Sequence, residues 1–415
     1  MGERVDCGVW CGPSDAGMSD ASVAQFVERA ARSGVTTPIM EVKGGHGLLR
    51  YPSREFAEAV EPGYEGFDMP AHLLRRCREA GIQLHAWFID YYEGEQGPAF
   101  RRHPEWAATD ADGRPTCGTT LRGNRYGAVW MCPARRPGYT DQWLVPLIRE
   151  FAERYEVDAV HHDYIRYPGD LAPDTYCFCD DCLRELPRWA GFVSDAIPDE
   201  PFYHELYDRP YLESHWEQSP RVLPANWDRL PRSMKSRFLL HGGFFQGGLN
   251  DLDHFFYSYR MHWVTEFARE VREAVRQARP QMEFSAAVFK NPIHSGRFIG
   301  QDWRTFAPYV EHCMPMDYRD HFPGTFEQYL TLLAEAIGRQ KVWARDYRTL
   351  WPGFAVNFLY KEEAEAAVPQ AEWPHEKLRR AVAAIRAAGT GRLCIFCAGQ
   401  LTAYGMWDTL REALG

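Results

Sequence analysis

The chain has 415 residues, of which 45% are hydrophobic and 25% are charged, and its formal net charge is -10. This length suffices for one large core with insertions or for two ordinary domains. The acidic balance argues against nucleic acid or an anionic membrane as a partner, because both require a basic surface. No apolar run approaches the length of a membrane span, and the N-terminus has no secretory signal pattern. Eleven scattered cysteines favour a reducing compartment, so we expect a cytoplasmic protein.

Short apolar runs alternate with amphipathic segments along the whole chain. The strand-like runs are residues 5–11, 37–43, 82–90, 157–165, 282–290, 310–318, 341–346 and 392–398. The helical segments are residues 19–33, 69–80, 139–155, 252–278, 326–338, 373–388 and 401–414. Eight strands alternating with helices predict an α/β fold, a single (β/α)8 TIM barrel spanning residues 1–415. An open doubly wound sheet is disfavoured, because the first strand is not followed by a G-x-G-x-x-G turn.

Two connections are much longer than the others. They are residues 91–138, after the third strand, and residues 167–250, after the fourth. Connections of this length are typical of functional loops, so we expect both insertions at the C-terminal face of the barrel, as walls of a cleft. The alternative is that they are a solvent-exposed elaboration or an oligomer contact.

Residues 157–168, Val-Asp-Ala-Val-His-His-Asp-Tyr-Ile-Arg-Tyr-Pro, carry the densest chemistry in the chain. A short apolar stem runs directly into imidazole, carboxylate, phenol and guanidinium groups. Because the C-terminal ends of barrel strands open on the active-site face, polar groups gathered there indicate catalysis. Asp163 is therefore the first candidate for a catalytic residue. The alternative is that Asp163 and Arg166 only brace a loop as an ion pair.

Several motifs occur in the order and at the separations found in a known group of proteins. They are Ala-Gly-Ile-Gln-Leu-His-Ala-Trp-Phe at 80–88, His-Pro-Glu-Trp at 103–106, Asp-Ala-Asp-Gly at 110–113, the run at 157–168, and Met-Pro-Met-Asp-Tyr at 314–318. In these the chain resembles the bacterial glycosyl-hydrolase-like proteins loosely named family-10-like, over nearly its whole length. The resemblance implies a (β/α)8 barrel acting on glycosidic bonds. The chain departs from the pattern at 122–137 and in the insertion after Tyr167, the parts expected to select a substrate.

Glycoside hydrolysis requires two carboxyl groups across the scissile bond, one protonated and one ionised. The predicted strand ends supply five acids: Glu41, Asp90, Asp163, Asp317 and Asp346. From strand alternation we predict Asp163 as the nucleophile or base and Asp317 as the general acid, facing each other across the cleft. Asp346 is the second choice of acid, and Asp90 ranks last, because by alternation it faces opposite to His85 and Trp87.

Further polar and aromatic residues at the strand ends are predicted to bind an oligosaccharide or glycoside substrate. They are Trp10, Glu41, His85, Trp87, Arg166, Tyr167, Lys290, Tyr318 and Asp346. Several have structural alternatives: Glu41 can pair with Lys43, His85 can be a core histidine, and Trp10 can fill the barrel end. A non-catalytic carbohydrate-binding barrel is the alternative function, since it would keep the aromatic residues without needing paired acids.

The metal-like patterns in the sequence are incomplete. His161 and His162 are adjacent in a strand, so they point to opposite faces and cannot easily share a metal. The first strand ends in Val9-Trp-Cys11, where a metal-dependent deacetylase would need His-x-His. Cys177, Cys179 and Cys182 match half of a zinc knuckle, but no fourth ligand is evident, and Cys394 and Cys397 lie in the last strand. We therefore expect no cofactor and less than one zinc per chain, with structural zinc as the alternative.

Overall fold

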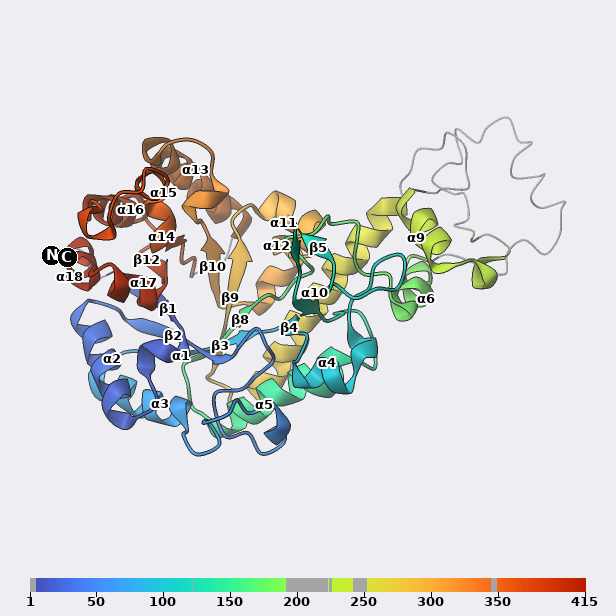
Figure 1. Cartoon of the computed structure of the whole chain (residues 1–415), viewed down its shortest axis with the longest axis horizontal. Helices are drawn as coiled ribbons and strands as arrows, with labels where there is room; N and C mark the ends of the chain where they lie inside the picture. The colour runs from blue at the N-terminus through green and yellow to red at the C-terminus, as the bar shows by residue number, and fades with distance from the viewer. Residues whose placement is uncertain (1–4, 122, 192–222, 224–225, 242–251, 345–348) are drawn as a thin grey trace.

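The computed structural model describes residues 5–121, 123–191, 223, 226–241, 252–344 and 349–415. Eight parallel strands form a closed barrel, in which the first strand pairs with the last. In chain order they are β1 (Asp6–Cys11), β2 (Thr37–Lys43), β3 (His85–Ile89), β8 (Ala159–Asp163), β9 (Glu283–Phe289), β10 (His312–Met316), β11 (Gly353–Ala355) and β12 (Arg392–Phe396). Figure 1 shows the helices arranged around this sheet. The predicted (β/α)8 TIM barrel is confirmed.

Each predicted helical segment corresponds to a principal helix, although the segment at 401–414 is divided between α17 (Ala398–Ala403) and α18 (Trp407–Leu414). They are α2 (Asp20–Arg32), α3 (Met69–Ala80), α5 (Val145–Arg154), α10 (Leu252–Ala278), α13 (Phe326–Ala344), α16 (Glu376–Ala387) and α18 (Trp407–Leu414). Ser19 caps α2, since its hydroxyl accepts a hydrogen bond from the Ser22 backbone N–H at 3.1 Å. Gly81 ends α3 in the left-handed conformation that glycine adopts without a steric penalty, at φ 67°.

In the described part of the chain, shorter α-helices and strands lie between these elements, together with short 3-10 helices and one π-helical turn at Thr140–Leu144. The helices are α1 (Pro13–Ala16), α4 (Pro98–Arg102), α6 (Asp180–Trp189), α9 (Arg232–His241), α11 (Pro292–Ile299), α12 (Trp303–Phe306), α14 (Val356–Leu359), α15 (Lys361–Glu365) and α17 (Ala398–Ala403). The strands β4 (Tyr92–Gly94) and β7 (Ala128–Trp130) form one antiparallel pair, and β5 (Thr120–Leu121) and β6 (Asn124–Arg125) form another. Both pairs belong to the first insertion.

The seventh strand is not where the sequence predicted it. Within the expected run at 341–346, the first four residues continue helix α13, and residues 345–348 lie outside the described part of the chain. The seventh barrel strand is instead β11, only three residues long, which pairs with β10 and β12. The helix α13 therefore extends six residues beyond its predicted end at Gly338.

Each barrel strand is buried on both faces, so two separate cores lie on either side of the sheet. Inside the barrel, Trp10, Ile39, Trp87, Met314 and Trp351 belong to one cluster. The alternate residues pack outward against the helices in a second, larger cluster. The face of the strand on which a residue lies decides whether its side chain can reach the barrel mouth.

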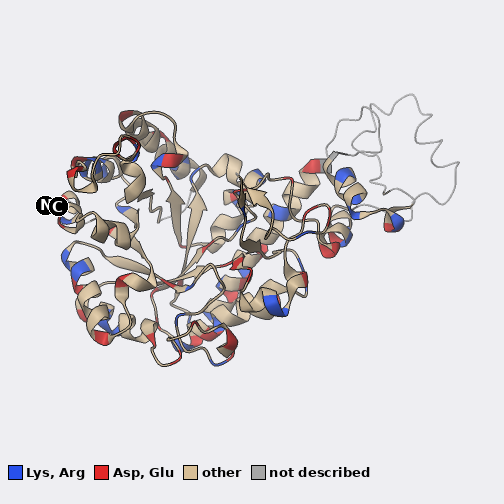
Figure 2. Ribbon diagram, in the orientation of Figure 1, with Lys and Arg blue, Asp and Glu red and all other residues tan. Residues whose placement is uncertain are grey.

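The remainder of the molecule extends away from the barrel on one side. In Figure 1, α6 and α9 of the second insertion lie at the right, beyond β4, β5 and the long helix α10. Basic and acidic residues are interspersed over the helices in Figure 2. Among the described residues, no helix combines the length and the apolar character that a membrane span requires.

Candidate active site

A hydrogen-bonded polar layer fills the middle of the barrel. The Trp10 Nε1–H donates to His161 Nε2 at 2.9 Å, and His161 Nδ1 lies 2.9 Å from the Ser285 hydroxyl. His85 Nδ1 lies 3.1 Å from the same hydroxyl. Since His161 accepts at Nε2, its proton is on Nδ1 and is donated to Ser285. Burial lowers the pKa of both histidines, so this layer is neutral and forms the floor beneath the mouth.

Two predicted substrate-binding residues belong to this floor and not to the mouth. His85 is fully buried and Trp10 is 1% exposed. The prediction that they bind substrate is wrong for this reason, and the alternatives of a core histidine and a barrel-filling tryptophan describe them. Trp87 lies one interior position further along β3 than His85 and is 7% exposed, and its Nε1–H has no acceptor among the described residues.

Asp163 ends β8 on the same interior face as His161. One carboxylate oxygen accepts a hydrogen bond from the Tyr164 backbone N–H at 2.7 Å, and the residue is 8% exposed. Burial raises the pKa of Asp163 to about 6, against the opposing effect of Arg166. A carboxyl group with such a pKa can hold a proton near neutral pH and release it in a reaction.

An aromatic cage holds Arg166 next to this carboxyl group. The guanidinium carbon lies 4.4 Å from the Tyr164 ring centroid and 4.9 Å from those of Trp130 and Phe289. Tyr164 adopts a left-handed backbone conformation at φ 56°, which is uncommon for a residue with a side chain and occurs often at functional sites. Trp130 of β7 and Tyr164, the residue after β8, also contact Tyr92 of β4, so the three aromatic rings form one wall.

Glu41 is the second acid on the interior face of the barrel mouth. It shares that face of β2 with Ile39 and pairs with Arg50 at 2.6 Å. Burial raises the pKa of Glu41, while Arg50 opposes the shift. The negative charge of Glu41 also contributes to the raised pKa of Asp163, so the two carboxyl groups interact electrostatically.

The alternative pairing of Glu41 with Lys43 is wrong. A register shift between these residues separates them, and Lys43 instead contacts Glu93 of β4 at 3.1 Å. Its ammonium group also donates to the Ile89 carbonyl at 2.5 Å. The Tyr139 hydroxyl donates to the same Glu93 carboxylate at 2.6 Å. This buried ion pair fastens the start of the first insertion to the barrel.

Asp317 does not face the cleft, and its predicted pairing with Asp163 is therefore wrong. Its carboxylate accepts a hydrogen bond from Gln340 of α13 at 2.7 Å, in the layer between β10 and that helix. Met314, on the opposite parity, belongs to the interior cluster. Lys290 lies on the same outer side, where its ammonium group donates to the His321 carbonyl and lies 3.4 Å from the Phe322 centroid.

Tyr318 does belong to the mouth. It is half-buried, and the Asp163 carboxylate raises the pKa of its phenol in addition to the larger effect of burial. Its ring contacts Phe396 of β12 at 5.7 Å. The mouth therefore combines Glu41, Asp163 and Tyr318 with the aromatic wall.

The other predicted residues lie elsewhere. Tyr167 is 1% exposed and turns away from the mouth, where Arg260 stacks on its ring at 4.4 Å, so its predicted substrate contact is wrong. Asp346 lies outside the described residues. Asp90 faces outward as expected and lies 2.9 Å from His162, which confirms that His161 and His162 point to opposite faces.

Three residues of the site were not found from the sequence. Arg50 lies nine residues after Glu41 in a loop without a recognisable pattern, and Tyr92 and Trp130 belong to the first insertion. Tyr164 lies in the segment 157–168 that the sequence singled out, but the sequence did not predict its left-handed backbone conformation.

The expectation that only three cysteines cluster is also wrong. Cys132, from the first insertion, joins Cys177, Cys179 and Cys182, and all four sulfur atoms lie within 4.8 Å of one another. All four side chains are buried and none forms a disulfide.

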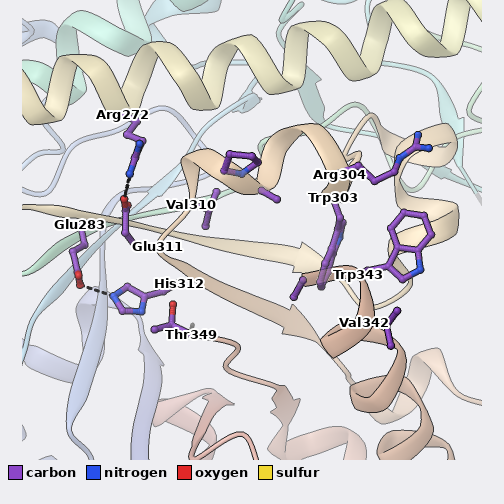
Figure 3. A pocket seen from close by; sticks show the side chains of 13 residues that line it. Arg272, Glu283, Trp303, Arg304, Val310, Glu311, His312, Val342, Trp343 and Thr349 are labelled. Carbon is purple, nitrogen blue, oxygen red and sulfur yellow. Dashed lines mark hydrogen bonds and ion pairs between the residues drawn. The ribbon is translucent and has the colours of Figure 1, made fainter. Parts of the chain in front are cut away.

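A pocket of about 830 Å³ lies at the opposite end of the barrel (Figure 3). Glu283 and His312, the first residues of β9 and β10, form part of its lining and bind each other at 2.5 Å. Glu311 is likewise paired with Arg272. Active sites of TIM barrels lie at the C-terminal ends of the strands. This pocket lies at the N-terminal ends, so we do not assign it as the active site despite its size.

Comparisons with known proteins relate part of the chain to a glycosyl hydrolase. The chain is 25% identical over 179 residues to glycosyl hydrolase YngK of Bacillus subtilis (strain 168), covering 39% of this chain and 31% of that protein. It is 23% identical over 226 residues to an S-layer-related protein of Niallia circulans, covering 49% of this chain and 14% of that protein. The chain thus spans less than a third of the length of either relative.

Solved structures show the same fold. The glycoside hydrolase domain of PgaB (BpsB) from Bordetella bronchiseptica matches with a TM-score of 0.66 and 13% identity, over 99% of both chains. The catalytic domain of a β-amylase from Paenibacillus polymyxa matches with a TM-score of 0.55 and 12% identity, over 100% of this chain and 99% of that one.

A family model covers most of the chain. The family described as "Putative glycosyl hydrolase domain" matches residues 8–338. These matches support a glycosyl-hydrolase group in general and do not single out the family-10-like proteins that the sequence motifs resemble. The chain belongs to this glycosyl hydrolase family.

Proposed function

We propose that the protein hydrolyses a glycosidic bond at the C-terminal mouth of the barrel, with Asp163 and Glu41 as the two carboxyl groups. The observation that carries the proposal is Asp163 itself, a buried acid at a strand end on the interior face, whose pKa is raised to about 6. Glu41 replaces Asp317 as the partner, because Glu41 shares that face and interacts with Asp163 while Asp317 is bound to Gln340.

The surroundings of the two acids favour different roles. Among the described residues, the Asp163 carboxylate accepts a hydrogen bond from one backbone N–H, and its pKa is raised, which suits the general acid. Burial raises the pKa of Glu41 as well, but Arg50 at 2.6 Å opposes this shift and places a positive charge beside the carboxylate, which suits the nucleophile or base. This exchanges the role that the sequence assigned to Asp163.

The spacing of the strands suits this pair. Only β3 separates β2 from β8, so the two backbones lie about 10 Å apart along the barrel wall. Because both side chains turn inward, we expect the carboxyl groups to come closer, within the range of about 5 to 9.5 Å that retaining and inverting enzymes use.

In the reaction, Asp163 gives its proton to the glycosidic oxygen as the bond to the anomeric carbon breaks, so the leaving alcohol departs neutral. The Glu41 carboxylate either bonds to the anomeric carbon or removes a proton from the water that attacks it. In the first route, the ionised Asp163 then takes a proton from water, and the resulting hydroxide releases the sugar from Glu41.

The aromatic wall favours an oligosaccharide substrate. Tyr92 and Tyr164 are half-buried and present rings on one side of Asp163, whereas Trp130 is fully buried behind them. Tyr318 lies near Asp163 from the end of β10. Rings with an apolar face and a polar edge fit the faces and hydroxyls of sugars.

Leaving-group dependence tests the roles. A panel of dinitrophenyl glycosides and unactivated oligosaccharides identifies a substrate of the wild-type protein. Asp163→Asn should lose about 10²- to 10⁴-fold in kcat on unactivated substrates, because their leaving oxygen needs a proton. The same variant should retain most activity on dinitrophenyl glycosides, whose leaving group departs without one. Glu41→Gln should lose activity on both.

Asp317→Asn is the matched control, since it makes the same chemical change at an acid outside the mouth. Wild-type turnover in Asp163→Asn on unactivated substrates, or loss of turnover in Asp317→Asn with the fold intact, would overturn the assignment. Tight oligosaccharide binding by calorimetry with no hydrolysis of any substrate would favour the alternative, a carbohydrate-binding barrel.

A further inference from the structure

The four clustered cysteines come from two insertions that are far apart in sequence. Cys132 follows β7 closely in the first insertion, whereas Cys177, Cys179 and Cys182 lie in the second, at the start of α6. The sulfur atoms of Cys132 and Cys182 are 3.5 Å apart, and those of Cys132 and Cys179 are 3.8 Å apart. The cluster is thus a compact group of four thiol ligands.

These distances fit a metal ion better than they fit thiols packed by chance. A zinc ion binds thiolates at about 2.3 Å in a tetrahedron, which places the sulfur atoms about 3.8 Å from one another. A disulfide would require about 2.05 Å. Neutral thiols behave as small apolar groups, and apolar packing alone does not bring four sulfur atoms specifically together.

The surroundings would stabilise the negative charge of four thiolates around a divalent ion. Cys179 is the N-cap of α6 and Cys182 lies in its first turn, where free backbone N–H groups and the helix dipole favour negative charge. The Cys179 backbone N–H lies 3.4 Å from the Cys177 sulfur. The guanidinium group of Arg260, 2% exposed, also interacts electrostatically with Cys177.

Other contacts hold the same two segments together. Arg135 forms an ion pair with Asp181 at 2.6 Å, which joins the residues just after Cys132 to those between Cys179 and Cys182. The Phe178 backbone N–H donates to the Thr109 carbonyl at 2.8 Å. The ligands are therefore held in place from both insertions.

We propose that Cys132, Cys177, Cys179 and Cys182 bind one structural zinc ion that joins the two insertions. Four buried thiolates leave no open coordination position, so the ion takes no part in hydrolysis. A tetrahedral set of four sulfur ligands selects zinc or iron, and sulfur atoms within 4.8 Å of one another enclose one ion and leave no room for the inorganic sulfide of an iron–sulfur cluster. The proposal is independent of the glycosidase assignment.

Elemental analysis of the purified full chain tests the proposal. We expect one zinc per chain in the wild-type protein and a loss of zinc to background in Cys132→Ser, which removes the ligand from the first insertion. The matched control is Cys117→Ser, which changes a cysteine of the same insertion outside the cluster and should keep one zinc. Cobalt substituted for zinc should give the visible absorption bands of a tetrahedral thiolate site.

A measurement on the wild-type protein covers the case in which Cys132→Ser does not fold. Titration with an organomercurial in the presence of a zinc-sensitive dye should release one zinc per chain as the thiols react. One iron per chain in place of zinc, metal-free folded protein with all eleven thiols reactive, or two disulfides among the four cysteines by mass spectrometry would each overturn the proposal.

Discussion

Asp163 is held in a position where its charged form is poorly solvated. Burial is the largest cause of its raised pKa, and it outweighs the attraction of Arg166. The folded protein therefore binds the proton of Asp163 more tightly than the unfolded chain does. A catalytic acid gains a usable proton in this way, at the expense of stability above its pKa.

This cost can be measured as a pH-dependent stability difference. Between the ordinary carboxyl pKa of 3.8 and the folded-state value of about 6, the unfolded chain binds fewer protons, so the free energy of unfolding falls as pH rises. Asp163→Asn removes the ionisation. We expect the variant to be more stable than the wild type by about 1–3 kcal/mol above pH 6, with no gain near pH 4. Urea unfolding across this pH range measures the difference.

The control for this experiment is Asp408→Asn, since the Asp408 side chain is 80% exposed. It should show little change at any pH. A difference for Asp163→Asn that stays constant with pH, or grows as pH falls, would contradict the explanation.

Asp317 should act on stability and not on turnover. Asp317→Ala removes the acceptor of the Gln340 side-chain N–H, and leaving such a buried donor unpaired costs about 1–3 kcal/mol. Asp317→Asn keeps an oxygen that can accept the same bond, so it should retain most of the stability. Thermal unfolding and turnover of the two variants separate these effects. A stable Asp317→Ala variant with impaired turnover would show that the residue serves the reaction.

For single residues, the sequence correctly predicted that Asp163 lies at the barrel mouth and wrongly predicted the same of Asp317. Asp163 follows an apolar stem, so its place at the end of a strand could be predicted. The face of Asp317 could not, because β10 is apolar on both sides and alternation does not distinguish its interior from its exterior. Cys132 lies 45 residues before Cys177, and no local pattern joins them.

Most helices and strands were predictable, because the hydrophobic periodicity of the sequence and its helix-capping residues agree with the faces that the structure buries. The predicted position of the seventh strand was wrong for a physical reason. The apolar residues Val342, Trp343 and Ala344 belong to the last turn of α13, where Val342 is 71% exposed, whereas β11 has three residues, too few to show a strand period. The neighbours β10 and β12 hold β11 in the sheet, and this information is absent from its own sequence.

The ion pair between Lys43 of β2 and Glu93 of β4 should stabilise the attachment of the first insertion. Both side chains are fully buried. Glu93→Gln leaves the ammonium group of Lys43 without its counter-charge, and breaking a buried pair in this way costs about 3–5 kcal/mol. Denaturant unfolding measures the loss.

The double variant Lys43→Met with Glu93→Gln removes the uncompensated charge. It should recover part of the stability lost in Glu93→Gln. An additive loss in the double variant would show that the two charges are not coupled.

The barrel as a whole depends on the contact between its first and last strands. Gly8 of β1 faces Cys394 of β12, and a methyl group on Gly8 would lie 2.6 Å from the Cys394 sulfur. Gly8→Ala should therefore destabilise the barrel by about 1–3 kcal/mol through overpacking. Cys394→Ala removes the obstructing sulfur, so the double variant should be more stable than Gly8→Ala alone. Calorimetric unfolding of the four proteins tests this, and failure of the second change to compensate would exclude this contact as the cause.

The aromatic cage around Arg166 has a consequence for the conditions under which the protein works. Arg166 is 7% exposed and lies between three rings, so dissolved ions cannot approach its charge closely. Exposed pairs such as Arg380 and Glu327 weaken as salt is added, whereas buried charges are screened much less. The attraction of Arg166 for Asp163 should thus persist in brine, and the protonation of Asp163 should follow pH in the same way in dilute and in saline water.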